Sequence, residues 1–228
     1  MIKCQDFILA FYPKKKYTKR MVQKKYKLCL GIDTASDLTS VALLDSEGHF
    51  ATDQTDSPRG QGEILFRMIQ NVFQKMGKTP KDLTHIAVTI GPGSFTGVRI
   101  GLSTARGLGL ALNIPVLGVD NFCATAYGLK QKLTVVLDSK RDDYFAQDFD
   151  AKGHPINDQI IISSANLKKR HPLNIAGSGA EKLSTEISCT IIKNPNPLAL
   201  NVAQIALKSP KDTTEPHPLY LRDADVTI

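Results

Sequence analysis

Apolar positions along the chain follow two periods, and the change between them is sharpest in the stretch 86–112. Its first residues, IAVTI, are apolar and mostly β-branched, which is typical of a buried strand. The glycine corner 91–94 (GPGS) follows, and apolar residues then recur at helical spacing. Ser94 or Thr96 is placed to cap this helix with its side-chain oxygen. The pattern therefore predicts a strand, a tight turn and a helix over 96–112.

The same two periods recur along the rest of the chain and predict alternating strands and helices. Strands are expected over 27–33, 40–45, 49–54, 86–90, 116–119, 133–138, 144–149, 159–163 and 187–192, and helices over 62–76, 96–112, 121–130, 180–183 and 197–208. Because the strands and helices come in two successive sets, we expect an α/β protein with two lobes, each a mixed sheet flanked by helices. The first lobe is expected over 27–118 and a smaller second lobe, with an extended C-terminal tail, over 119–228.

Two of the expected helices carry unusual faces. The apolar side chains of 62–76 spread over roughly 200° of arc, about twice what a helix covering a single core needs. In 96–112, small residues recur every fourth position and form a seam that another helix could approach closely. For the helix over 62–76 we expect either a protein–protein interface or burial of both of its sides within the chain. If there is a partner, we expect Phe66 and Phe73 to lie nearest to it. The expected interface residues are Phe66, Ile69, Phe73, Gly97, Gly101, Ala105 and Gly109.

Charge changes this picture only at the N-terminus. Residues 1–27 hold nine Lys or Arg against one Asp, whereas the other 201 residues hold 20 basic and 21 acidic side chains. The net charge of +7 therefore belongs to a basic extension, 1–26, which we expect to be poorly ordered. No apolar run reaches the ~18 residues of a membrane span. Four scattered cysteines predict reduced thiols in a cytoplasmic protein without a membrane partner.

Candidate chemistry gathers where expected strands end. Asp33 closes the first strand and Thr34 follows it, while the glycine corner supplies Gly91, Gly93 and Ser94. A strand, a glycine corner and a helix start form an arrangement that can cradle an anion such as phosphate, because the backbone amides at the helix start point outward. The order of strand, Asp, short polar turn and hairpin resembles the start of actin-like ATPases and sugar kinases, in which a glycine soon after the Asp lets the backbone wrap a phosphate. In this chain Thr34 is followed by alanine and serine instead. The sequence therefore predicts a vestigial phosphate site.

Several stretches resemble the bacterial TsaB family: GPGSFTGVRIGLSTARGLGLAL with LGIDTAS before it and VLGVDN after it, then VVLDSKRDDYFAQDF, IAGSGAEKL and PLYLRDADVT. The resemblance covers about 27–226 and implies a two-lobed actin-like ATPase (ASKHA, ribonuclease H-like) fold. It also implies a non-catalytic structural and activating subunit of the machinery that makes threonylcarbamoyladenosine (t6A) in tRNA. The implied partners are a TsaD-like transferase, a TsaE-like ATPase, tRNA through the complex, and a second copy when the chain is alone. No catalytic residue, metal or cofactor is expected, and ATP or ADP should bind at most weakly in the complex.

Other functional classes fit the residues less well. No two of the five histidines lie within one helical turn and no G-x-S-x-G elbow occurs, so neither a metal site nor a serine hydrolase is predicted. A dinucleotide-binding oxidoreductase is disfavoured because the glycines between 91 and 97 are spaced one residue too widely, and Pro92 removes an amide donor. A free-standing ATPase or kinase of the actin-like fold is the remaining alternative, weakened by the missing loop glycine.

Overall fold

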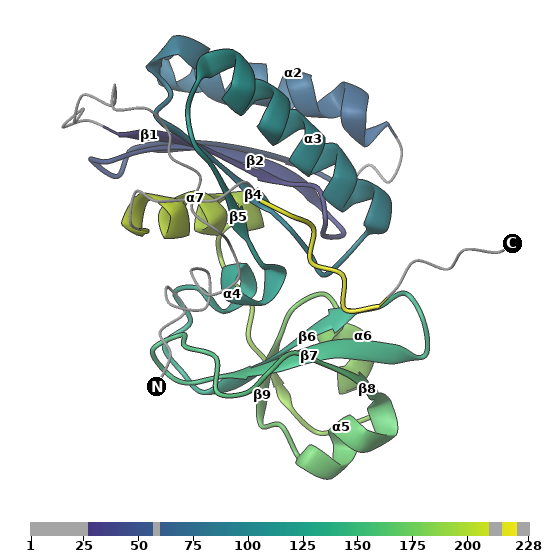
Figure 1. Ribbon diagram of the computed structural model, residues 1–228. Coiled ribbons are helices and arrows are strands. Elements are labelled where there is room, and N and C mark those ends of the chain that lie inside the picture. The colour runs from purple at the N-terminus through teal and green to yellow at the C-terminus, as the bar shows by residue number, and fades with distance from the viewer. Residues whose placement is uncertain (1–26, 57–59, 210–215, 223–228) are drawn as a thin grey trace, which may run out of the picture.

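The computed structural model describes residues 27–56, 60–209 and 216–222 (Figure 1). The expected basic extension, 1–26, lies outside the described residues. The strands are β1 (Leu28–Asp33), β2 (Thr39–Asp45), β3 (Phe50–Thr55), β4 (His85–Thr89), β5 (Val116–Val119), β6 (Leu133–Asp138), β7 (Asp143–Phe149), β8 (Ile160–Ser163), β9 (Asn174–Ala176) and β10 (Thr190–Ile191). The helices are α2 (Gln61–Met76), the short 3₁₀ helix η1 (Pro80–Asp82), α3 (Phe95–Leu112), α4 (Asn121–Ala126), α5 (Ser164–Arg170), α6 (Ala180–Ser184) and α7 (Leu198–Lys208).

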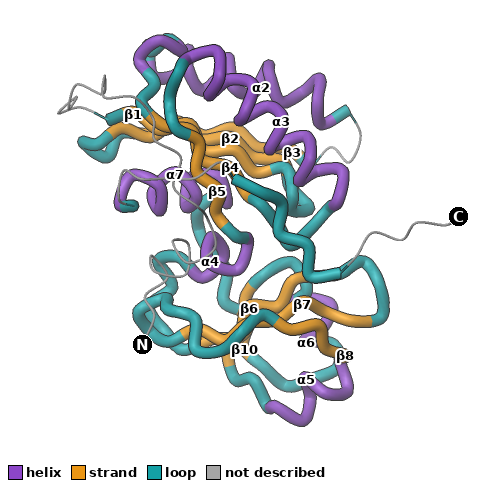
Figure 2. The backbone as a smooth tube through the Cα atoms, in the orientation of Figure 1, coloured by secondary structure: helices purple, strands orange, loops and turns teal. Residues whose placement is uncertain are grey.

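The strands form two five-stranded sheets with the same internal plan (Figure 2). The first has the order β3-β2-β1-β4-β5 and the second the order β10-β9-β6-β7-β8. In each, the first strand in sequence pairs antiparallel with the next strand on one side and parallel with a later strand on the other. The expected fold class, two mixed sheets flanked by helices, is therefore confirmed.

Helices cover both faces of the first sheet (Figure 1). α2 and α3 pack on one face, over the core that holds Leu30 and Ile32, and α7 packs on the other, over Cys29. A Cβ at Gly31 would lie 2.1 Å from the carbonyl oxygen of Ala199, so glycine is required for α7 to come this close to β1. The segment expected as a second lobe over 119–228 thus contributes α7 to the first sheet.

The second sheet is covered in the same way by shorter helices. α4 packs on one face through Phe122, against Val135 and Phe149, and α5 and α6 pack on the other through Leu167 and Leu183. The expected helix over 121–130 is wrong in length, because the chain leaves α4 after Ala126 and turns at Gly128, whose φ is +79°. α5 has no counterpart among the expected helices.

Candidate functional site at the strand ends

The carboxylate of Asp33 is fully buried at the end of β1. Its Oδ1 accepts hydrogen bonds from the Thr89 hydroxyl at 2.8 Å and from the Ala35 amide at 3.1 Å. Its Oδ2 is buried without a well-aligned hydrogen bond from any residue that the structure describes. Burial raises the pKa of Asp33 to about 6, although the hydrogen bonds from Thr89, Ser36 and Ala35 lower it. Asp33 therefore takes up a proton at a pH where surface carboxyls stay charged.

The loop after β1 lies directly on the start of α3. The Thr34 hydroxyl donates to the carbonyl oxygen of Gly97 at 2.6 Å, and the Ser94 amide donates to the carbonyl oxygen of Ala35 at 2.8 Å. Ser94 caps α3, because its hydroxyl accepts from the Gly97 amide at 3.1 Å. A Cβ at Gly93 would lie 2.2 Å from the carbonyl oxygen of Ala35. Thr34, Gly93 and Ser94 are thus brought together, but by contacts between two segments of the chain's own backbone.

Gly91 faces a different segment, the tail 216–222. A Cβ at Gly91 would lie 2.7 Å from the carbonyl oxygen of Leu219. The backbone amide of Leu219 in turn donates a hydrogen bond to the carbonyl oxygen of Ile90 at 2.7 Å. The Tyr220 ring lies 5.1 Å from the Phe95 ring, at the start of α3. Further along, the Arg222 guanidinium pairs with Asp143 of β7. The tail therefore joins the end of β4 to the second sheet (Figure 1).

A pocket of about 280 Å³ lies between the two lobes. Its lining combines the glycine corner, the β6–β7 turn and the tail: Pro92, Gly93, Phe95, Ser139, Arg141, Phe145, Leu219, Tyr220, Leu221 and Arg222. Beside it, the Lys140 ammonium lies 2.6 Å from Asp37 of the first lobe and 3.4 Å from Asp138 of the second. The contact with Asp37 is the main cause that raises the pKa of Lys140. This ion pair links the two strand-end loops directly.

The second lobe repeats the strand-end arrangement, which sequence reasoning missed. Asp138 ends β6 as Asp33 ends β1, and its amide donates to the Ser178 hydroxyl at 3.0 Å. Gly177, with a φ of +108°, lies so close to β6 that a Cβ would be 2.4 Å from the carbonyl oxygen of Val136. The available signal was the second strand that ends in aspartate, followed later by Gly-Ser-Gly.

Of the expected interface residues, Phe66 is exposed and the others are buried. Phe66 is 54% exposed on α2, whereas Phe73 is 5% exposed and packs with Ile69 in the core beneath that helix. The expectation that Phe73 faces a partner is therefore wrong for the folded chain. The wide apolar arc of α2 is used mainly against β2 and β3.

The small-residue seam of α3 faces the chain's own first sheet rather than another helix. A Cβ at Gly97 would lie 1.9 Å from the carbonyl oxygen of Thr34, and one at Gly101 would lie 2.5 Å from the hydroxyl oxygen of the same residue. A Cβ at Gly109 would lie 2.3 Å from a methyl carbon of Val116, and Ala105 is fully buried. The seam lets a helix approach closely, as expected, but α3 is the helix that approaches.

The family model described as TsaD, tRNA N6-adenosine threonylcarbamoyltransferase, matches residues 56–213. The TsaB protein of Escherichia coli (strain K12) is 37% identical over 106 residues, which is 45% of this chain and 44% of that protein. The TsaB protein of Haemophilus influenzae is 32% identical over 124 residues, 52% of each chain. The chain belongs to the TsaB branch of the TsaD family. Its matched stretch spans about half the length of these curated TsaB relatives.

Solved structures agree with this TsaB assignment at the level of the fold. YeaZ from Pseudomonas aeruginosa superposes with a TM-score of 0.70 at 22% identity, covering 86% of this chain and all of that one. The activator of the 2-hydroxyisocaproyl-CoA dehydratase from Clostridium difficile, solved with bound ADPNP, superposes with a TM-score of 0.51 at 14% identity. It covers 78% of this chain and 94% of that one. The actin-like fold is thus shared with a nucleotide-binding protein.

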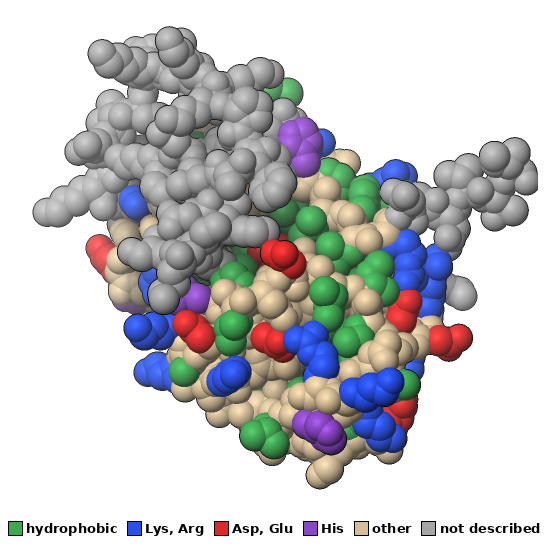
Figure 3. Space-filling model, turned by 60° about the horizontal axis from the view of Figure 1, so that its bottom comes forward, with side chains coloured by type: hydrophobic (Ala, Val, Ile, Leu, Met, Phe, Trp, Pro, Cys, Tyr) green, Lys and Arg blue, Asp and Glu red, His purple; other side chains and the backbone are tan. Residues whose placement is uncertain are grey.

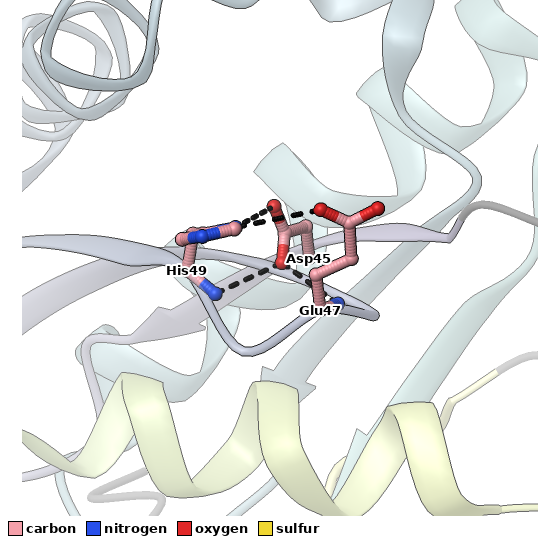
Figure 4. A group of neighbouring side chains, drawn as sticks. All are labelled: Asp45, Glu47 and His49. Carbon is pink, nitrogen blue, oxygen red and sulfur yellow. Dashed lines mark hydrogen bonds and ion pairs between the residues drawn. The ribbon is translucent and has the colours of Figure 1, made fainter.

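One group of side chains in this TsaB-family chain has ligand atoms close enough to hold a cation, within the residues that the structure describes. Asp45, Glu47 and His49 place them within 4.8 Å of one another (Figure 4). The Asp45 carboxylate, however, accepts hydrogen bonds from the backbone amides of Glu47 and His49, each at 2.9 Å. The group is therefore explained by the turn between β2 and β3. None of the described helices is long and apolar enough to cross a membrane.

Proposed function

We propose that this chain serves in t6A biosynthesis as a non-catalytic structural and activating subunit that pairs with a TsaD-like transferase. Membership of the TsaB branch supports the pathway. The observation that carries the non-catalytic part is the closed loop after β1, where a phosphate-binding loop would need open space. The carbonyl oxygens of Thr34 and Ala35 lie against Gly97 and Gly93 so closely that not even a Cβ fits between them.

The surface proposed for the partner is the outer side of α2 and the neighbouring edge of the first sheet. Phe66 on α2 and Phe50 on β3 are each 54% exposed, and Leu110 at the end of α3 is 86% exposed. α2 contacts α3, so Phe66 and Leu110 belong to the helical layer on one face of the first sheet. Phe50 pairs in register with Leu44, which packs with α7, so its side chain lies on the other face of the sheet, at the edge strand that α2 adjoins. Large apolar side chains exposed on adjacent elements are typical of protein–protein interfaces. A TsaD-like chain with a related fold can present the equivalent layer, and a second copy can do so when this chain is alone.

The other proposed members of the assembly are a TsaE-like ATPase and the tRNA itself, both reached through the complex. The proposed site of action is cytoplasmic, and no catalytic residue is assigned. Because the loop after β1 is closed, ATP or ADP alone should bind with a dissociation constant in the high micromolar range or above, on the order of −5 kcal/mol. Turnover of ATP by the purified chain would favour the free-standing ATPase instead.

The experiment that tests the pathway is deletion of the gene in its native cell, followed by mass spectrometry of tRNA nucleosides. We expect t6A to fall sharply and to return when the wild-type chain is supplied. Unchanged t6A in the deletion strain would refute the proposed pathway.

The interface is tested by binding of a purified TsaD-like protein to three single variants. Phe66→Ser should weaken binding at least about tenfold while the melting temperature stays unchanged. Leu173→Ser, which changes a side chain that is 78% exposed on the second lobe, is the matched control and should alter neither quantity. Phe73→Ser should lower the free energy of unfolding by about 3 kcal/mol or more, because Phe73 is core. Unchanged binding by Phe66→Ser would remove α2 from the interface.

A further inference from the structure

Positive charge is concentrated at one end of the second lobe, in two segments that are far apart in sequence. We call this surface the basic end and define it by Lys130, Lys132, Lys168, Lys169 and Arg170, all of which are exposed. The segments 128–134 and 164–174 that carry these residues contain no Asp or Glu. The chain outside residues 1–27 is nearly neutral, so this local excess is a property of the surface and not of the overall composition.

The fold brings the two segments together around a concave surface. The Asn174 side-chain amide donates to the carbonyl oxygen of Lys132 at 3.0 Å, which joins the start of β9 to the start of β6. A pocket of about 320 Å³ lies there, and its lining includes Lys132, Arg170 and His171. Figure 3, which brings the underside of the molecule forward, shows Lys and Arg side chains on the left of that face as well as on the lower right, with Asp and Glu side chains between them.

The charges of the basic end are only partly used by the folded chain. Arg170 pairs with Asp148 at 2.5 Å, and cations in the last turn of α5 also favour the exposed carbonyl groups there. Within the described part of the chain, none of the four lysine ammonium groups pairs with a carboxylate. Lys130 and Lys132 lie outside α5, so favourable interaction with the end of that helix does not explain their positive charge at this surface. Four solvated lysines in one region carry a cost of mutual repulsion that a polyanion would remove.

The basic end lies at the opposite end of the second sheet from the pocket between the lobes. Lys132 precedes the first residue of β6, whereas Asp138 is its last, and a strand of six residues spans about 20 Å. A ligand at the basic end would therefore leave the interlobe pocket and the proposed partner surface on α2 free. Such a surface is suited to holding a large polyanion in place while chemistry proceeds elsewhere in an assembly.

We propose that the basic end binds the phosphate backbone of RNA, with the four lysines and Arg170 as the contacting groups. The inference rests on the proposed function, because that function makes tRNA the polyanion that the assembly must hold. Lysine contacts to phosphate position a nucleic acid without reading its sequence. Binding should therefore depend steeply on salt and little on the identity of the tRNA.

The test measures binding of a fluorescently labelled, unmodified tRNA transcript to the full chain as a function of salt. Lys130→Gln/Lys132→Gln and Lys168→Gln/Lys169→Gln are made separately and combined. The matched control is Lys81→Gln/Lys152→Gln, which removes two charges from exposed positions elsewhere. The combined variant should bind about tenfold or more weakly at moderate salt, and its salt slope should fall by about one for each phosphate that is no longer neutralised.

Each outcome supports or overturns the proposed RNA site. Intermediate losses of affinity in both double variants, with an unchanged control and unchanged melting temperatures, would support the basic end. Affinity in the combined variant equal to that of the control would overturn it, as would loss of binding to phosphatidylserine vesicles without any loss of tRNA binding. If the deletion strain lacks t6A while the combined variant binds tRNA normally, only this inference fails. If the deletion strain keeps t6A, the proposed function fails, whatever the binding shows.

Discussion

Replacing Gly97 by alanine tests whether the seam of α3 is part of the first lobe's own core. The new Cβ would lie 1.9 Å from the carbonyl oxygen of Thr34, over 1 Å inside the 3.0 Å that such contacts require. Both atoms belong to backbone, so no side chain can rotate away. We expect Gly97→Ala to separate the loop after β1 from α3 and to lengthen the 2.6 Å hydrogen bond between the Thr34 hydroxyl and Gly97.

The expected change in the free energy of unfolding follows from one stabilising effect and two destabilising ones. Alanine gains about 1 kcal/mol over glycine inside a helix. Overpacking costs about 1–3 kcal/mol, and here the upper end applies because the clash is with backbone. Weakening of the Thr34 hydrogen bond costs about 1 kcal/mol more. The free energy of unfolding should therefore fall by about 2–3 kcal/mol, which is about 4–12 °C in melting temperature for a chain of this size.

The assay is urea unfolding followed by circular dichroism, with Gly107→Ala as the control. Gly107 lies in the same helix, and a Cβ there meets nothing within 4 Å. This control should gain up to about 1 kcal/mol from helix propensity alone. If the seam faced a partner instead, both variants would be stabilised in the isolated chain and only Gly97→Ala would lose affinity for the partner. A Gly97→Ala variant as stable as Gly107→Ala would refute the intramolecular packing.

Three further predictions concern charged and nucleophilic groups. The pKa of Asp33 is about 6 in the folded chain and about 4 when unfolded, so the native state binds the extra proton between these values and stability falls as pH rises through them. Asp33→Asn should therefore be more stable than the parent at pH 7 by up to about 3 kcal/mol, with the difference gone near pH 4 in thermal melts. Burial raises the pKa of Cys29 to about 12, so Cys29 should stay unmodified by a thiol reagent in the native chain while the less buried Cys189 reacts. A double-mutant cycle of Asp37 and Lys140, both largely exposed, should give a coupling of about 1 kcal/mol or less that shrinks with salt, and a larger salt-independent value would contradict this.

Elements with a clear period could be predicted from the sequence, and elements without one could not. The helix over 96–112 agrees with α3 because its apolar and small residues recur at helical spacing over many turns. α5 was not predictable in this way, because Leu167 is its only buried residue and seven residues hold less than two turns. The return of α7 to the first sheet depends on contacts between residues distant in sequence, such as Gly31 with Ala199, which no local pattern contains.

The candidate site illustrates the same limit for glycine. A glycine at a strand–helix corner indicates that something approaches the backbone closely, but the sequence does not say whether that is a ligand or the chain itself. Here Gly93 meets Ala35, 58 positions before it, and Gly91 meets Leu219, 128 positions after it. Both approaches are made by backbone carbonyl groups, which would repel phosphate rather than bind it. A nucleotide bound by this chain would therefore not place its phosphates at the glycine corner.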